Sequence, residues 1–434
     1  MAAAAGTWGK GRPHYAWVVL ACAIAIGAVS SGVRMSFGVL IDPLAEQYGW
    51  SRGAISGASS VMFLSSIPLL LGAGLMADRM GARRICLVAA TGTATGMFLT
   101  GTMTHLWQFY LYYGFLLGGF AMIFVVVLPV LLMRWFHRRA GLALGLVWAA
   151  MAVGAMTAPP ILRWLISSAG WRQAFFLTGI AASAVMFVAV FFLRGHPREV
   201  GTVPYGAMAR TSAPDAEGPP PRPTLTLGQV RRTSAFWHLI NLHFLGCVGH
   251  SIILVHVVSM AIRAGVPGLT AAGVLSAMAG ASIAGRLASP MVAERLGGRK
   301  TFALVFLLQG LPVFLLFWAD LPWQFYLFAL VFGPGYGGET PPFPVVSRQY
   351  YGANSPLNSI NGWQLAGAQV GMALGAWLGG ALFDLTGTYA WSIAAAAIFT
   401  LAGLWSVRAL PTHRPGEVVL APAGRGAARG GAGD

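Results

Sequence analysis

Long apolar stretches separated by short polar turns run through nearly the whole of this 434-residue chain. A transmembrane helix needs about 20 mostly apolar residues, and twelve stretches meet that requirement. The pattern therefore predicts an all-α membrane protein with twelve transmembrane helices. The predicted spans are residues 16–40, 54–76, 85–104, 107–133, 140–162, 173–193, 236–262, 270–292, 301–319, 323–346, 356–383 and 389–410.

One connection, residues 194–235, is much longer than the others and divides the spans into two sets of six. It holds seven prolines between Arg194 and Arg232 and shows no apolar periodicity, which is typical of a loop. We therefore expect a six-helix bundle at 16–193, a central loop at 194–235 and a second six-helix bundle at 236–410. Polar tails at 1–15 and 411–434 flank the bundles.

Composition excludes most other classes of protein. Hydrophobic residues make up 56% of the chain and charged residues 9%, whereas a soluble protein is about a quarter charged. The net charge of +16 comes from 26 Arg and two Lys at the ends of apolar runs, so it does not indicate nucleic-acid binding. Cys22, Cys86 and Cys247 lie far apart inside apolar segments, and the sequence predicts neither a metal site nor a disulfide.

The basic residues also predict the orientation in the membrane. With the N-terminus inside, 22 of the 28 Lys and Arg residues fall in cytoplasmic loops or tails. Because cytoplasmic loops are enriched in basic residues, we expect both termini in the cytoplasm. The remaining six are Arg52, Arg163, Arg172 and Arg263 in outer loops, and Arg34 and Arg286 within spans.

The two halves resemble each other at a constant offset of 216 residues. Trp107–Leu111 and Trp323–Leu327 have the same sequence, and Asp78–Gly81 is matched by Glu294–Gly297. Parallel six-helix repeats around a site at the membrane midplane are typical of secondary transporters. The offset therefore predicts two pseudo-symmetric halves.

The turn after the second predicted span carries a specific motif, G-x-x-x-D-R-x-G-x-R-R. A small residue permits close helix approach, an acid can accept hydrogen bonds from a neighbouring helix N-terminus, and arginines anchor to lipid phosphate. The motif resembles the signature of the major facilitator superfamily, whose fold has twelve helices in two halves. Its residues, which we expect to control conformation, are Gly74, Asp78, Arg79, Gly81, Arg83 and Arg84.

Further segments are similar to the bacterial monocarboxylate and oxalate/formate branch of that superfamily: Ser36–Leu40, Gly49–Arg52, Arg134–Gly145 and Ala381–Tyr389. The resemblance implies a secondary active transporter of small monocarboxylates that works by alternating access as a monomer, without a cofactor. It also implies a place in the bacterial cytoplasmic (inner) membrane, with a small organic anion, protons and the lipid bilayer as partners.

Arg286 is the strongest candidate for substrate binding. It lies eight residues before Glu294, roughly 12 Å inside the membrane from that helix end. A buried arginine is costly unless it faces a cavity or a partner, and a guanidinium binds a carboxylate through two parallel hydrogen bonds. The monocarboxylate transporters that the chain resembles bind the substrate carboxylate with an arginine at this place. Candidates for the rest of the substrate site are Tyr336, Gln364, Trp148 and Phe120.

The proton-coupling candidates are Glu339, whose depth matches that of Arg286, and His250. Animal relatives that couple to protons carry an aspartate one turn before the arginine, where this chain has Ser282. We expect Glu339 to pair with Arg286 in the empty carrier and to take a proton when a substrate carboxylate binds. A structural ion pair or a packing role is the alternative for each of these residues, and for Arg34 it is the favoured one.

Two further points narrow the predicted function. The predicted eleventh helix lacks the lysine that oxalate exchangers use for a second carboxylate, which favours a substrate with one. His243 and His256 flank His250, but no carboxylate lies near them in sequence, so no metal site is expected.

The alternative function is export of drugs or other organic molecules by proton antiport, with Glu339 recognising a cation. We find no nucleophile–base pair and no nucleotide loop, so an enzyme or an ATP-driven pump is not predicted.

Overall fold

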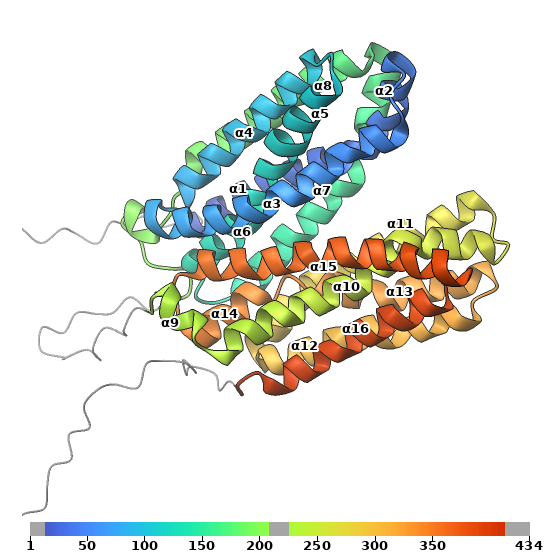
Figure 1. Ribbon diagram of the computed structural model, residues 1–434. Helices are drawn as coiled ribbons and strands as arrows, with labels where there is room; N and C mark the ends of the chain where they lie inside the picture. The colour runs from blue at the N-terminus through green and yellow to red at the C-terminus, as the bar shows by residue number, and fades with distance from the viewer. Residues whose placement is uncertain (1–13, 208–224, 413–434) are drawn as a thin grey trace, which may run out of the picture.

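The computed structural model describes residues 14–207 and 225–412, apart from the side chain of Arg52. The parts of the predicted tails and central loop that fall at 1–13, 208–224 and 413–434 lie outside the described residues. Nearly all of the described chain is helical. Figure 1 shows the helices in two bundles that lie against each other, one from each half of the sequence.

The N-terminal bundle contains the first six predicted spans. Its first and fourth spans are each built from more than one helical segment, and the fourth contains a π-helix, η2. The segments are α1 (Tyr15–Met35), η1 (Ser36–Leu40), α2 (Ile41–Tyr48), α3 (Arg52–Met80), α4 (Ala82–Thr102), α5 (Leu106–Phe109), η2 (Tyr110–Gly119), α6 (Phe120–Trp135), α7 (Ala140–Ala169) and α8 (Trp171–Phe192).

The C-terminal bundle follows two short elements of the central loop, η3 (Pro197–Val200) and α9 (Leu227–Arg231). Its ninth span ends in a 3₁₀ segment, η4. The segments of the bundle are α10 (Ser234–Arg263), α11 (Gly268–Leu296), α12 (Gly298–Gly310), η4 (Leu311–Trp318), α13 (Pro322–Gly338), α14 (Phe343–Tyr351), α15 (Leu357–Thr386) and α16 (Ala390–Ala409).

Within the described residues, eleven helical stretches are long and apolar enough to cross a membrane. The remaining predicted span, residues 323–346 and the tenth along the chain, is divided into α13 and α14 by a break at Glu339–Pro342. The glycine-rich run Gly333–Gly338 is itself helical. The break comes just after it because two consecutive prolines, Pro341 and Pro342, supply no backbone N–H and cannot continue a helix.

The glycines of α13 serve close packing rather than a break. A Cβ atom added at Gly333 would lie 2.7 Å from the Cβ of Ala281, and one added at Gly335 would lie 2.6 Å from the backbone nitrogen of Gln309. On the facing helix α11, a Cβ at Gly285 would collide with the carbonyl oxygen of Pro334. Small residues let helix backbones approach closely, and these positions fix how α11, α12 and α13 pack.

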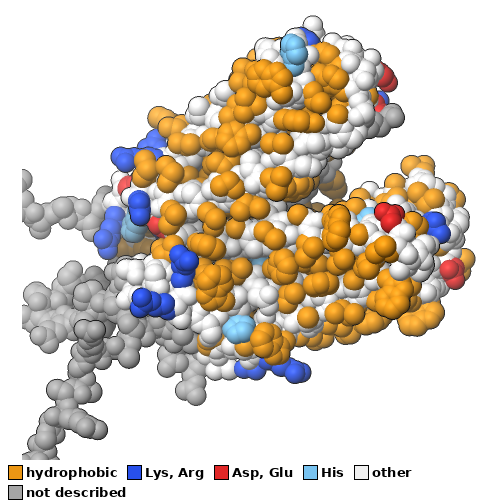
Figure 2. All heavy atoms as spheres, in the orientation of Figure 1, with side chains coloured by type: hydrophobic (Ala, Val, Ile, Leu, Met, Phe, Trp, Pro, Cys, Tyr) orange, Lys and Arg blue, Asp and Glu red, His pale blue; other side chains and the backbone are white. Residues whose placement is uncertain are grey.

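The two bundles touch at one end and diverge at the other. Contacts between them run along α3 with α15 and α7 with α11. In Figure 1 the bundles separate from these contacts towards α2 and the start of α11. We call the touching end, where Met80 and Leu296 end their helices, the closed end, and the opposite end the open end. Figure 2 shows apolar side chains on the flanks of both bundles and basic side chains mostly at the closed end.

The packing of α11 on α13 gives a test of the fold. We expect Gly285→Ala to lower the melting temperature of the purified protein in detergent, because the new methyl group must push α13 away. Overpacking of this kind costs about 1–3 kcal/mol. The matched control is Gly280→Ala on the same helix, where an added Cβ meets nothing within 4 Å. Equal melting temperatures for the two variants would contradict the observed packing.

Candidate functional site

The acid of the motif after α3 joins the two bundles at the closed end. The carboxylate of Asp78 accepts hydrogen bonds from the backbone nitrogen and Nδ2 of Asn358, at 3.3 and 2.8 Å, and from the backbone nitrogen and Oγ of Ser359, at 2.8 and 2.6 Å. These donors form the N-terminal turn of α15, where backbone N–H groups lack partners within the helix. The predicted role of Asp78 as an acceptor for a neighbouring helix N-terminus is therefore seen directly.

The segment that matches part of this motif in the second half, Glu294–Gly297, makes the same kind of contact on the other side of the interface. Glu294 Oε2, at the end of α11, accepts a hydrogen bond of 3.0 Å from the backbone nitrogen of Gly141 in the first turn of α7. At both contacts the backbones of the two helices come so close that only glycine fits. A Cβ at Gly74 would lie 2.6 Å from the carbonyl oxygen of Asn358, and one at Gly141 would lie 2.6 Å from that of Pro290.

Two arginines at the closed end donate hydrogen bonds to backbone carbonyl oxygens. Arg348 of α14 donates from Nη1 to the carbonyl oxygens of Met133 and Phe136 in the other bundle, at 2.6 and 3.0 Å. Arg83 donates to the carbonyl oxygens of Val190 and Phe191 at the end of α8. The other arginines of the motif, Arg79 and Arg84, are exposed, and Gly81 takes a positive φ of 88° between α3 and α4.

Arg286 lies between the bundles, on α11, with two aromatic rings beside its guanidinium. Its Cζ atom is 6.0 Å from the ring centre of Trp148 on α7 and 5.7 Å from that of Tyr336 on α13. Its Nε is 3.5 Å from Ser282 Oγ. Among the described residues, no carboxylate lies within ion-pair distance of this guanidinium. The structure thus brings together Arg286, Trp148 and Tyr336 as predicted, and it leaves the cation available to an anion.

A second guanidinium, that of Arg34, belongs to this group, although the sequence favours a structural role for it. Arg34, at the end of α1, interacts electrostatically with Tyr113 of its own bundle and with Tyr336 and Arg286 of the other. In the described part of the chain it forms no ion pair. In the sequence, the internal repeat is the signal that could have linked Arg34 to the site, because Arg34 is the counterpart of His250 at the offset of 216.

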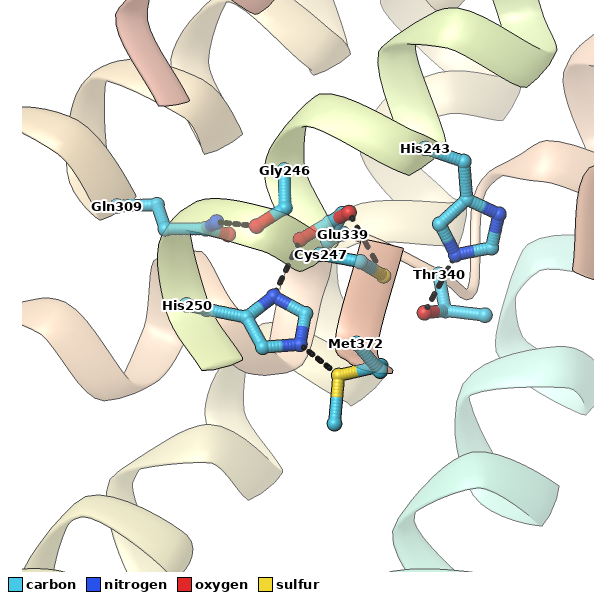
Figure 3. A network of polar contacts seen from close by, with 8 residues as sticks. All are labelled: His243, Gly246, Cys247, His250, Gln309, Glu339, Thr340 and Met372. Carbon is cyan, nitrogen blue, oxygen red and sulfur yellow. Dashed lines mark hydrogen bonds and ion pairs between the residues drawn. The ribbon is translucent and has the colours of Figure 1, made fainter. Parts of the chain in front are cut away.

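Glu339 pairs with His250 rather than with Arg286, so the predicted pair in the empty carrier is wrong. The distance from His250 Nδ1 to Glu339 Oε2 is 2.9 Å, and the carboxylate is completely buried (Figure 3). Glu339 follows the last residue of α13 at the break, and there its side chain turns towards α10. Gly246 of α10 leaves room for it, because a Cβ there would contact the carboxylate.

The pair belongs to a larger buried network, drawn in Figure 3. Cys247 Sγ lies 3.7 Å from Glu339 Oε1, and His250 Nε2 lies 3.0 Å from Met372 Sδ on α15. The ligand-type atoms of His243, Cys247 and Glu339 lie within 4.8 Å of one another. No carboxylate lies near the histidines of α10 in sequence, but folding brings Glu339 to His243 and His250.

Two predicted substrate residues lie elsewhere. Phe120 packs against Gly92 on α4 and forms an edge contact with Phe115, with ring centres 5.8 Å apart, so it faces its own bundle. Gln364 is buried near the closed end, where its Nε2 donates to Ser347 Oγ at 3.0 Å. Neither residue contacts the Arg286 group in the described structure.

The comparison with family models decides the family. The model described as Major Facilitator Superfamily matches residues 22–356 and 291–429. The chain belongs to this superfamily. It is therefore a membrane transporter rather than an enzyme, which confirms the predicted family and the all-α, twelve-span fold.

Curated relatives and solved structures agree with this assignment. The chain is 28% identical over 428 residues to monocarboxylate transporter 13 of Rattus norvegicus, covering 96% of this chain and 94% of the relative. It is 25% identical over 399 residues to an uncharacterized transporter of this superfamily, YcxA of Bacillus subtilis, covering 89% and 93%. The superfamily transporter FucP, solved in the outward conformation, has the same fold, with a TM-score of 0.69, 11% identity, and coverage of 92% of this chain and 100% of FucP.

The contact of Asp78 with α15 predicts how this superfamily member holds its closed end shut. We expect Asp78→Ala to shift the population towards a state in which the closed end is open, because hydrogen bonds to a charged group are worth about 1.5–3 kcal/mol each. Spin labels at the exposed positions Met80 and Lys300, one in each bundle, should then report a longer distance. Asp320→Ala at the open end is the control, and an unchanged distance in Asp78→Ala would refute this role.

Proposed function

We propose that the protein is a secondary active transporter of small organic monocarboxylates, with Arg286 binding the substrate carboxylate. The observation that carries this proposal is a guanidinium between the bundles that lacks a carboxylate partner among the described residues. Such a group is expensive inside a membrane unless an ion or water compensates it. The monocarboxylate transporters among the curated relatives favour the same class of substrate.

The aromatic rings beside Arg286 fit a small organic anion. Trp148 and Tyr336 come from different bundles, so a substrate held between them contacts both halves of the carrier. Arg34 adds a second positive charge near the same place. We propose that the two bundles, residues 16–193 and 236–410 joined by the loop 194–235, rock around this site in alternating access as a monomer.

The distribution of basic residues supports an orientation. The closed end carries the ends of α3 and α11 and the turns with Arg79, Arg84 and Arg295, and positive loops face the cytoplasm. We propose that the closed end is cytoplasmic, with both termini inside, in the cytoplasmic (inner) membrane of a bacterium. The open end then faces outward, and the structure corresponds to an outward-facing carrier.

We propose that the protein couples transport to protons through His250, whose two ring nitrogens both lie at hydrogen-bond distance from a partner. A thioether only accepts hydrogen bonds, so we propose that His250 Nε2 carries the hydrogen on the side of Met372 Sδ. Nδ1 and Glu339 Oε2 then share one proton, either as an imidazolium and a carboxylate or as an imidazole and a carboxylic acid. Both forms have zero net charge. Loss of the shared proton leaves one negative charge.

That charge can couple to the substrate through Tyr336. Its ring centre lies 5.1 Å from that of His250 and also lies beside the guanidinium of Arg286. We propose that the Glu339–His250 pair takes up one proton when a substrate carboxylate occupies Arg286. One anion and one proton would then move together, although Ser282 replaces the aspartate of proton-coupled relatives.

The alternative, an exporter that recognises cationic drugs through Glu339, has less support. Glu339 is completely buried and already bonded to His250, while the available charges between the bundles are the guanidinium groups of Arg34 and Arg286. Uncompensated positive charge favours anions over cations.

Uptake into proteoliposomes tests the substrate class. With labelled lactate, pyruvate, acetate, oxalate and formate, we expect uptake of at least one monocarboxylate and a loss of about ten- to a hundredfold in Arg286→Ala, the equivalent of a charged hydrogen-bond pair. Arg286→Lys should retain part of the activity, since it keeps the charge without the paired hydrogen bonds. Arg163→Ala, an exposed arginine at the open end, is the control. Full anion uptake by Arg286→Ala would overturn the proposal.

Proton coupling is tested by Glu339→Gln, which keeps the size of the side chain and removes its charge. We expect substrate-driven proton uptake to fall to the level of empty liposomes, while exchange of substrate for substrate continues. The control is Glu199→Gln in the central loop, whose carboxylate accepts a hydrogen bond of 3.3 Å from the nitrogen of Gly195. Undiminished proton uptake in Glu339→Gln would remove this residue from the mechanism.

A further inference from the structure

A cavity of about 740 Å³ lies at the closed end, away from the proposed substrate site. Its wall comes from three parts of the chain: the turn between α6 and α7, the end of α11, and Tyr205 with Gly206 of the central loop. The central-loop wall is fixed in place. The nitrogen of Tyr205 donates to the carbonyl oxygen of Trp135 at 2.8 Å, and its own carbonyl oxygen accepts from the nitrogens of His137 and Arg138 at 2.9 and 3.1 Å.

The lining is strongly basic. It includes the side chains of His137, Arg138, Arg139 and Arg295, and all four are exposed to this space or to solvent. Within the described residues, none of the three arginines forms an ion pair. The one carboxylate of the lining, Glu294, already accepts a hydrogen bond from the first turn of α7 and lies within electrostatic range of Arg348.

The backbone at this turn is held in an unusual conformation. Arg139 has φ 63° and ψ 25°, and it is the one non-glycine residue with positive φ in the described chain. This conformation disfavours side chains other than glycine, and retained backbone strain of this kind is typical of functional positions. The turn sets Arg138 and Arg139 on the rim that faces α11. Glycine would adopt this backbone conformation with less strain, so the presence of arginine at position 139 indicates a role for its charge.

We propose that this cavity binds a phosphate-bearing anion and that the bound anion stabilises the closed end. Guanidinium groups bind phosphate through paired, charge-assisted hydrogen bonds, and basic pockets between transmembrane helices bind anionic head groups. A phospholipid head group and a soluble phosphate compound share this chemistry.

The effect on conformation follows from the origin of the arginines. Arg138 and Arg139 belong to the N-terminal bundle, and Arg295 belongs to the C-terminal bundle. They line one cavity only while α7 packs on α11, where a Cβ at Gly141 would lie 2.8 Å from Met291 Cα. An anion that contacts the arginines of both bundles binds more tightly to the closed form than to a form in which the bundles separate at the closed end. A ligand shifts an equilibrium by such a difference in affinity.

Binding of pyrophosphate to the purified transporter in detergent tests the site directly, without any transport. We expect saturable binding by calorimetry, and a loss of at least tenfold in affinity for the pair of substitutions Arg138→Gln and Arg295→Gln. Arg139→Gly is a second variant, since it removes the charge while relieving the backbone. Arg299→Gln, an exposed arginine at the same end but outside the lining, is the control. Equal affinities in the double variant and the control would overturn the proposal.

Two further arms identify the source of the phosphate and its effect. Nanodiscs with phosphatidylglycerol, compared with neutral phosphatidylcholine, show whether a lipid head group competes with pyrophosphate. In either case, spin labels at Met80 and Lys300 should show a smaller separated population when the anion is bound. Binding that leaves this population unchanged would disprove the link to conformation. Because the site does not involve Arg286, loss of anion uptake in Arg286→Ala is independent of these results.

Discussion

The structure depends on acids of each bundle that cap helices of the other. Asp78 at the end of α3 holds the N-terminus of α15, and Glu294 at the end of α11 holds that of α7. An anion at a helix N-terminus is favoured by the helix dipole and by the free N–H groups. Both contacts cross the interface, so they exist only when the bundles touch at the closed end. The repeat in the sequence is thus a repeat of this contact.

Much of the fold could be predicted from the sequence because hydropathy alone determines which stretches span a membrane. The motif at Asp78 and the grouping of Arg286 with Tyr336 and Trp148 could also be predicted, because depth and charge limit where such residues can lie. The end of the tenth span was harder to place. Glycines at Gly333–Gly338 look like a break, but here they admit the backbones of neighbouring helices, and the break falls at the two prolines that follow.

The wrong predictions for Glu339 and Phe120 share one physical cause. The sequence predicts how deep in the membrane a residue lies better than it predicts which face of the helix the residue occupies. Glu339 has the depth of Arg286 but turns to His250, because it sits at a break where the helical rotation no longer applies. Phe120 follows the π-helix Tyr110–Gly119, whose wider turns shift the face that later residues present. Met372, which completes the environment of His250, gives no signal in sequence because a thioether in an apolar helix is indistinguishable from core packing.

The charges between the bundles are unequal in a way that bears on the transport cycle. The Glu339–His250 pair is neutral when it shares one proton, whereas Arg34 and Arg286 are not balanced by carboxylates in the described structure. Closing the open end over the empty site would remove water from these two guanidinium groups, which is costly in a medium of low dielectric constant. A bound anion compensates part of that charge before closure. If the central site takes an anion as proposed, the empty carrier therefore resists closure of the open end and the loaded one does not, and it is the substrate that permits the change of state.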